Sequence, residues 1–143
     1  MDGTDLPDPI AWASGIQAIY IESVWKQAAP LIERALNVNR GEYNLEDIRA
    51  AIVARDMQLW VYGEGSMIRA VAVTEIVRYP RRMVALVILC AGDSLAKWRG
   101  RVGLMEAWAR KQGCVEIKAI GRIGWARALG WQVLDTVTGR ALT

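Results

Sequence analysis

The sequence predicts a mixed α/β (α+β) domain in which helices flank a largely antiparallel sheet, with a helical arm at the N-terminus. The chain has 143 residues, of which 53% are hydrophobic and 23% charged, a composition typical of a single globular domain. Three apolar runs between residues 57 and 90 are joined by short turns, which predicts an antiparallel meander. Segments before and after these runs have apolar residues at helical spacing.

The N-terminal part of the chain is predicted to be helical. Asp8 and Pro9 are a typical start signal, and an apolar stripe follows from residue 10 to residue 36. Pro30 predicts a break or kink near Ala29. We therefore divide the chain into an arm, residues 1–20, and a domain, residues 21–143. A second helix starts after Asn44 with a capping box and ends near residue 56.

The central part is predicted to hold three strands and one long helix. The strands cover about residues 57–62, 67–79 and 82–90, and the third is so apolar that we expect it to be covered on both faces. The helix covers about residues 94–112, with Asp93 as its N-cap and Gly113 just after its end. The strand "CVEIKAI", a short helix "GWARAL" and a last strand "WQVLDTVT" are predicted to complete the chain.

The composition excludes several kinds of chemistry. The chain has no His, which removes the Ser-His-Asp triad, an imidazole base and His-based metal sites. Its two cysteines, Cys90 and Cys114, have apolar neighbours and are expected to be buried free thiols, too few for a zinc site. No apolar run approaches the ~20 residues of a membrane span, and the acidic start does not resemble a signal peptide.

Two basic clusters leave contact with nucleic acid open. The net charge is +3, and the clusters are "RYPRR" at residues 78–82 and "KWRGR" at residues 97–101. If both lay on one face, they could contact a DNA backbone. Basic clusters are, however, more often solvated turns and helix faces.

The order of elements and two phrases resemble the GNAT family of N-acetyltransferases. "MEAWARKQGCVEIKAI" is similar to the family's helix and following strand, and "GWARALGWQVL" to its closing segment. "MQLWV", "VTEI", "YPRR", "AGD" and "GRIGWARAL" further resemble small GNAT-like proteins that tailed phages encode beside virion structural genes. This resemblance implies a virion protein assembled in the host cytoplasm. Its implied partners are phage virion or assembly proteins, or further copies of the chain. It implies no contact with a membrane.

The resemblance also predicts a degenerate acetyl-CoA site. The family's pattern is Arg or Gln, two residues, Gly, one residue, then Gly or Ala, which lets the backbone approach a pyrophosphate at a helix start. Counting from Arg99, the two glycine positions fall on Val102 and Leu104. Counting back from Gly113 places the loop at residues 95–98, which have no glycine. If the site does bind a cofactor, the candidate residues are Lys97, Arg99, Gly100, Arg101 and Gly103.

The catalytic requirements of the family are met only in part. Ala126 stands where many members have a Tyr as general acid, and an alanine has no proton to donate. Glu75 lies where members often have a catalytic Glu, and Tyr79 is near it in sequence. A lone Glu on a strand is more often solvated or in an ion pair, and Gly100 and Gly103 more often interrupt or pack a helix.

Two functions remain open at this point. In the first, the chain is a non-catalytic phage virion structural or assembly component without cofactor, and Trp12, Tyr20 and Trp25 of the arm anchor protein contacts. The alternative for the arm is that it folds back on its own domain. In the alternative, the chain is an acetyl-CoA-dependent N-acetyltransferase with a divergent cofactor loop.

Overall fold

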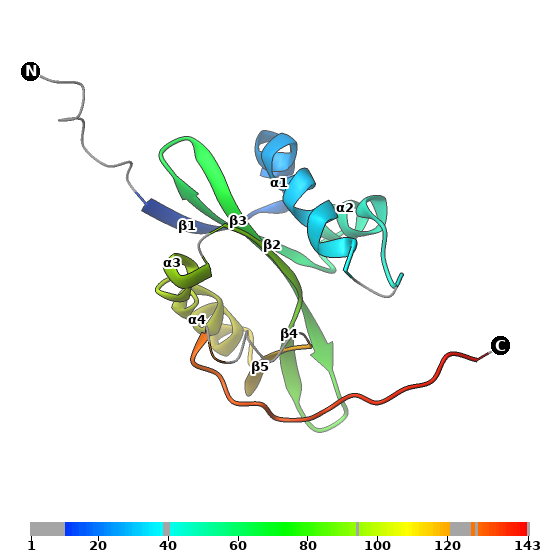
Figure 1. Cartoon of the computed structure of the whole chain (residues 1–143). Coiled ribbons are helices and arrows are strands. Elements are labelled where there is room, and N and C mark those ends of the chain that lie inside the picture. The colour runs from blue at the N-terminus through cyan, green and yellow to red at the C-terminus, as the bar shows by residue number, and fades with distance from the viewer. Residues whose placement is uncertain (1–10, 39–40, 94, 121–126, 128, 143) are drawn as a thin grey trace, which may run out of the picture.

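The computed structural model describes residues 11–38, 41–93, 95–120, 127 and 129–142. It has one five-stranded sheet in the order β1-β2-β3-β4-β5 (Figure 1). The first four strands pair antiparallel and β5 runs parallel to β4, so the predicted mixed α/β class is confirmed. The elements are β1 (Ala11–Ile16), the 3-10 turn η2 (Ala18–Tyr20), α1 (Ile21–Leu36), α2 (Leu45–Val53), β2 (Gln58–Glu64), β3 (Met67–Arg78), β4 (Met83–Gly92), α3 (Leu95–Arg99), α4 (Gly103–Lys111) and β5 (Glu116–Ala119).

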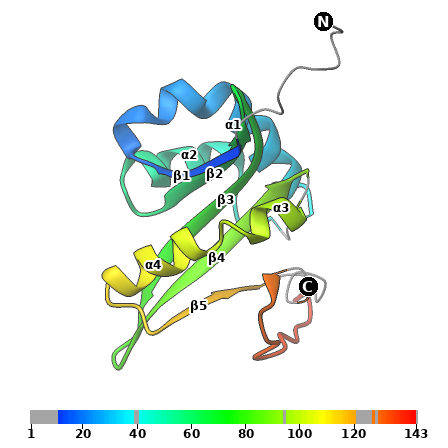
Figure 2. The ribbon, with the colours of Figure 1, turned by 90° about the vertical axis from the view of Figure 1, so that its left-hand side faces the viewer.

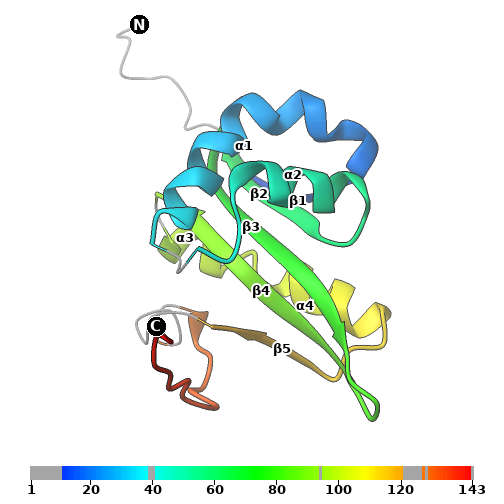
Figure 3. The same ribbon diagram turned by 90° about the vertical axis from the view of Figure 1, so that its right-hand side faces the viewer.

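Helices cover the sheet on both faces, as Figures 2 and 3 show. The alternation along β3 fills two cores, because successive side chains of a strand point to opposite faces. Val71 and Val73 pack into the core beneath α1 and α2. Ala70 and Ala72 pack into the core beneath α3 and α4. The expectation that the third predicted strand, residues 82–90, is covered on both faces is confirmed, because β4 places Leu89 in the first core and Val87 in the second.

The prediction of one helix from residue 10 to residue 36 is wrong in its first part. Residues 11–16 form β1, which pairs antiparallel with β2, and α1 begins only at Ile21. Trp12 and Ile16 are four residues apart, a spacing that puts two side chains on one side of both a helix and a strand. The division of the chain at residue 20 stays a prediction, because residues 1–10 lie outside the described part. Residues 11–16, however, belong to the sheet.

Of the predicted break or kink near Ala29, the break is wrong, because α1 runs without interruption through Pro30, and the kink stays a prediction. Proline has no N–H, so one carbonyl oxygen of the preceding turn has no donor within the helix. Pro30 is exposed, so water can donate a hydrogen bond to this oxygen instead. The predicted cap of α2 is confirmed. The Asn44 side chain accepts from the Asp47 N–H at 2.8 Å, and the Asp47 carboxylate accepts from the Asn44 N–H at 3.0 Å.

The C-terminal half departs from the prediction in two places. The long helix is divided into α3 and α4 by a turn at residues 100–102, although Gly113 does end it, with a φ of 93°. Residues 131–142 are predicted to contain a strand, but in the structure they pair with nothing as a strand. The predicted short helix "GWARAL" falls mostly on residues outside the described part.

A buried hydroxyl joins the first strands of the meander. Thr74 is fully buried, accepts from the Trp60 indole N–H at 3.0 Å and donates to the Gln58 side-chain oxygen at 2.9 Å. Substituting Thr74→Val should therefore lower the free energy of unfolding by about 1–3 kcal/mol, because it leaves a buried N–H without a partner. Thr74→Ser, which keeps the hydroxyl, is the control. Urea unfolding measures both, and an equal loss in the two variants would contradict the role of the hydrogen bonds.

Candidate active site

The fourth and fifth strands separate halfway along β4. They pair only where Val84–Val87 face Glu116–Ala119, and β4 then continues to Gly92 without β5. The pairing of β3 and β4 shifts at the same level, where Val73 faces Leu89 but Thr74 faces Val87. Ile88 is the extra residue of this β-bulge, and bulges bend a strand and end its regular pairing. Within the described part of the chain, backbone groups along one edge of residues 88–92 therefore pair with no strand.

Glu75 lies beside this bulge. It faces Leu86 on β4, one residue from the register shift, and its side chain is half-buried on the side of α1 and α2. The loop before α2 brings Tyr43 close to it. Burial raises the pKa of the Tyr43 hydroxyl, and the negative charges of Glu75 and Glu42 raise it further. Tyr43 thus stays protonated at neutral pH near the Glu75 carboxylate, as a donor that the sequence pattern gave no reason to choose.

Tyr79 does not lie close to Glu75. Four residues separate them, which is about 13 Å along an extended strand. Tyr79 lies in the turn between β3 and β4, is 47% exposed, and has the ammonium of Lys118 at 5.7 Å from its ring centre. The structure therefore places Tyr79 with the end of the hairpin and away from the bulge.

The other face of β4 is closed by aromatic side chains. Trp98 is 2% exposed, and its ring meets that of Tyr62 edge to face at 6.2 Å. Burial raises the pKa of the Cys90 thiol to about 11, although a hydrogen bond with Trp98 acts in the opposite direction. Cys90 is therefore a protonated thiol at neutral pH, but it is only partly buried, whereas Cys114 is buried as the sequence predicts.

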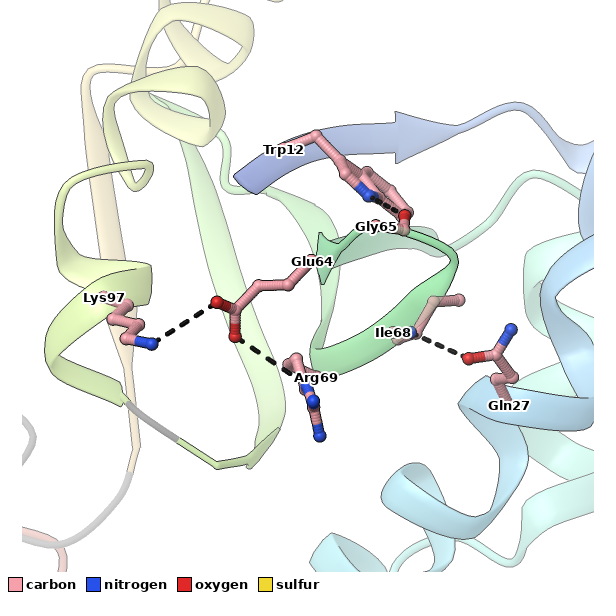
Figure 4. A network of polar contacts seen from close by, with 7 residues as sticks. All are labelled: Trp12, Gln27, Glu64, Gly65, Ile68, Arg69 and Lys97. Atoms are coloured by element: carbon pink, nitrogen blue, oxygen red, sulfur yellow. Dashed lines mark hydrogen bonds and ion pairs between the residues drawn. The ribbon is translucent and has the colours of Figure 1, made fainter. Parts of the chain in front are cut away.

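Of the predicted phosphate ligands, Lys97 already has a partner in the protein. Figure 4 shows that Glu64, at the end of β2, lies between Lys97 and Arg69. The Glu64 carboxylate is 3.3 Å from the Lys97 ammonium and 3.7 Å from Arg69 Nε. The same hairpin is held from α1 by Gln27, which accepts from the Ile68 N–H at 2.8 Å. Through this ion pair Lys97 holds α3 against the β2–β3 hairpin.

Two arginines of the cluster lack such a partner within the described part of the chain. Arg99 has no carboxylate within ion-pair distance there, and Arg101 reaches only the Ala11 carbonyl oxygen at 3.4 Å. The glycines next to these arginines in the sequence have open surroundings. A methyl group on Gly103 would meet nothing within 4 Å, and one on Gly100 only the Lys97 carbonyl at 3.7 Å. The glycines therefore interrupt the helix and do not pack it against anything.

Asp93, the predicted N-cap, makes two contacts across the sheet end. Its N–H donates to the Arg69 carbonyl at 3.0 Å, and its carboxylate is 3.8 Å from Arg34 of α1. Gly92, just before it, has a φ of 146°, and a Cβ there would lie 2.5 Å from Ala70. The chain thus leaves β4 through a close approach that only glycine permits.

The aromatic residues of the predicted arm mostly contact their own domain. Trp12 is half-buried and donates to the Gly65 carbonyl at 2.8 Å (Figure 4). Trp25 is half-buried and has the Arg49 guanidinium at 5.6 Å from its ring centre. Tyr20 is 57% exposed. A role of these three residues at an interface stays a prediction.

The two basic clusters do not adjoin each other. Residues 78–82 lie around the β3–β4 turn, whereas residues 97–101 follow the opposite end of β4, and ten residues of strand span about 33 Å. They therefore do not form one continuous surface for nucleic acid. Among the described residues, no group of three Cys, Asp or Glu side chains could hold a metal ion, and no helix is long and apolar enough to span a membrane.

Several solved structures with the same fold are acetyltransferases. An aminoglycoside N-acetyltransferase in complex with CoA matches with a TM-score of 0.71 and 11% identity, over 96% of this chain and 97% of that one. The aminoglycoside 6'-N-acetyltransferase of Acinetobacter haemolyticus matches with a TM-score of 0.71 and 12% identity, over 92% and 98%. A predicted acetyltransferase from Clostridium acetobutylicum, with acetyl-CoA, matches with a TM-score of 0.64 and 11% identity, over 92% and 96%.

These comparisons correct one hypothesis from the sequence. The hypothesis of a non-catalytic virion component is contradicted, because the structural neighbours are acetyltransferases and favour the alternative. No protein-family model and no curated protein matches the chain. At such identities the likeness shows the fold, and the chain has the mixed, mostly antiparallel fold of the GNAT acetyltransferases.

The site analysis makes a prediction about the two thiols. Because burial raises the pKa of both Cys90 and Cys114, the fraction of reactive thiolate at pH 8 should be very small. Ellman's reagent should therefore label neither cysteine in the folded protein within minutes, and both at once in 6 M guanidinium chloride. Rapid labelling of Cys90 in the folded state would show that the face of β4 beneath Trp98 is open.

Proposed function

We propose that the chain is an acetyl-CoA-dependent N-acetyltransferase with a divergent cofactor loop. The observation that carries this proposal is the separation of β4 from β5 at the Ile88 bulge, with Glu75 beside it. The fold shared with acetyltransferases supports the proposal. Origin in a tailed phage and location in a virion stay predictions from the sequence alone.

The residues present fit a phosphate-bearing cofactor held by side-chain charge. Arg99 and Arg101 lack carboxylate partners in the described part of the chain, and Gly100 and Gly103 leave open space beside them. Guanidinium groups bind phosphate oxygens with two parallel hydrogen bonds, so they can replace a glycine-lined backbone cradle. Lys97, which Glu64 engages, would contribute less. The free edge of β4 offers backbone groups to the amide-bearing arm of the cofactor.

The protein's own part in the chemistry centres on Glu75. The cofactor would supply an acetyl group activated as a thioester. Glu75 is placed to accept the proton that an acceptor amine loses as its nitrogen forms the new bond to the acetyl carbon. The Tyr43 hydroxyl, protonated at neutral pH and within reach of the charge of Glu75, would donate a hydrogen bond to this carboxylate or to the amine during the reaction. The departing sulfur would take its proton from solvent, because no Tyr follows Tyr79 in the sequence.

The first prediction concerns cofactor binding. Acetyl-CoA at 100 times its Kd should stabilise the protein by about 2.7 kcal/mol, seen as a rise in Tm. Arg99→Ala and Arg101→Ala should each weaken binding roughly 10- to 100-fold, because each removes a charge-assisted hydrogen bond to phosphate. Isothermal calorimetry gives both constants.

The control for this prediction removes a similar charge elsewhere. Arg110→Ala, in the last turn of α4, should leave the Kd unchanged. Acetyl-pantetheine, which lacks the nucleotide phosphates, should bind wild type and the Arg99 and Arg101 variants alike. No stabilisation by millimolar acetyl-CoA would refute the proposal.

The second prediction concerns the base. Glu75→Gln should lower the rate of acetyl transfer to an accepted amine by roughly 10²- to 10⁴-fold with little change in acetyl-CoA affinity, because it removes only the proton acceptor. Release of the CoA thiol measures the rate, with aminoglycosides and peptides with a free N-terminal amine as acceptors. Glu116→Gln, whose carboxylate pairs with Arg82 at 3.1 Å, is the matched control. Equal rates for Glu75→Gln and wild type would remove Glu75 from the mechanism.

A further inference from the structure

A surface cavity lies where the end of β1, the end of α2 and the start of β2 meet. Its volume is about 330 Å³, and its lining residues are Ile16, Gln17, Ala18, Ile19, Ile52, Arg55, Met57 and Gln58. Figures 2 and 3 show the connection from β1 to α1 beside the end of α2. Because β2 and β3 lie between β1 and β4, the end of β1 is about 14 Å, or three strand spacings, from β4. The cavity is therefore separate from the candidate active site.

The buried part of the cavity wall is apolar. Ile52 and Met57 are 1% and 6% exposed, and the half-buried Ile16 packs against the same core. At the rim Ile19 is 68% exposed, although isoleucine is among the residues most often buried in proteins. An apolar group that filled the cavity would remove this exposed surface from water. The wall and the rim therefore favour a ligand with an apolar part.

The charged group and the half-buried polar group of the cavity are hydrogen-bond donors. Arg55 has the single charge among the lining residues, and it forms no ion pair in the described part of the chain. The Gln58 amide oxygen already accepts from the Thr74 hydroxyl at 2.9 Å, which leaves the amide NH₂ group as a donor. A carboxylate only accepts, and a guanidinium can bind both of its oxygens. The polar groups therefore favour a carboxylate.

The backbone holds Arg55 in a conformation that side chains disfavour. Its φ is 67°, and no other described residue except glycines has a positive φ. The residue at this position after a helix is most often glycine. The turn is fixed because Arg55 N–H donates to the Ile52 carbonyl at 3.0 Å and Asp56 N–H to the Ala51 carbonyl at 2.9 Å. Residues held in such conformations cluster at ligand-binding sites, so the strain agrees with a role for the Arg55 side chain.

We propose that this cavity binds a small aliphatic carboxylate, with the aliphatic group against Ile52 and Met57 and the carboxylate on the Arg55 guanidinium. The Gln58 amide is the second donor to the carboxylate. A volume of about 330 Å³ is at the small end of the range for ligand sites, which suits a short branched chain such as that of 4-methylpentanoate. The proposal is independent of acetyl transfer.

The first experiment titrates the full-length ¹⁵N-labelled protein with sodium 4-methylpentanoate. Backbone amide signals of residues 16–19 and 52–58 should shift and saturate. The neutral 4-methylpentanamide and the cationic 4-methylpentan-1-amine have the same aliphatic group, and both should bind roughly 10-fold more weakly or less, because neither has a charge that Arg55 attracts. An absence of saturating shifts in these residues at millimolar concentration, or equal binding of the amine, would overturn the proposal.

The second experiment repeats the titration with variants of Arg55. Arg55→Gly should weaken binding of 4-methylpentanoate roughly 10-fold or more, because it removes the charged donor. Its Tm should be equal to or above that of wild type, since glycine adopts a positive φ without strain, so the loss of binding is not a loss of fold. Arg81→Ala, which removes an exposed charge from the β3–β4 turn, is the control and should leave the Kd unchanged. A folded Arg55→Gly variant that binds as wild type does would refute the proposal.

A last comparison separates a small ligand from the C-terminus of a partner protein, which presents the same carboxylate beside an aliphatic side chain. The peptide acetyl-Gly-Gly-Leu is titrated in parallel with 4-methylpentanoate. Binding of the peptide that is weaker than that of the small acid, or within roughly 10-fold of it, supports a small ligand. Tighter binding of the peptide than this would overturn the proposal in favour of a protein partner. None of these outcomes tests acetyl transfer.

Discussion

The β-bulge at Ile88 is the constraint on which the rest of the site depends. β4 supplies side chains to both cores, and at the bulge Ile88 and Leu89 both pack on the side of α1 and α2. The inserted residue ends the regular ladder, so β4 turns away from β5 while keeping its pairing with β3. The edge of β4 that β5 does not pair with, next to Glu75 of β3, follows from this change in one strand.

The charged side chains near the end of β4 fall into two groups: some form ion pairs within the protein, and others are left for a ligand. Glu64, with a side chain only 19% exposed, takes up the charges of Lys97 and Arg69, and Asp93 faces Arg34. These pairs close the end of the sheet, although exposed ion pairs of this kind contribute less than about 1 kcal/mol each. Arg99 and Arg101 form no such ion pair within the described part of the chain, so their charge is available to an anion.

The sequence predicted the elements whose signal is local and missed those set by distant contacts. The meander, the cap of α2 and the end of α4 follow from turns, a capping box and a glycine. β1 was missed because Trp12 and Ile16 fit a helix as well as a strand, and only pairing with β2 decides between them. Register is a property of two strands, so the bulge at Ile88 and the proximity of Tyr43 to Glu75 had no signal in one sequence.

The proposed binding of phosphate by arginine side chains, in place of a glycine-lined backbone cradle, changes how tightly a cofactor can be held. Backbone N–H groups at a helix start are held in place before the ligand arrives, whereas an arginine side chain loses about 2 kcal/mol of rotamer freedom when it is fixed. Phosphate recognition by Arg99 and Arg101 should therefore be weaker than by a cradle and more sensitive to salt, since exposed charges are screened. Under the proposed function, divergence of the loop would thus reduce affinity and leave unchanged the edge of β4 beyond Val87, which β5 does not pair with.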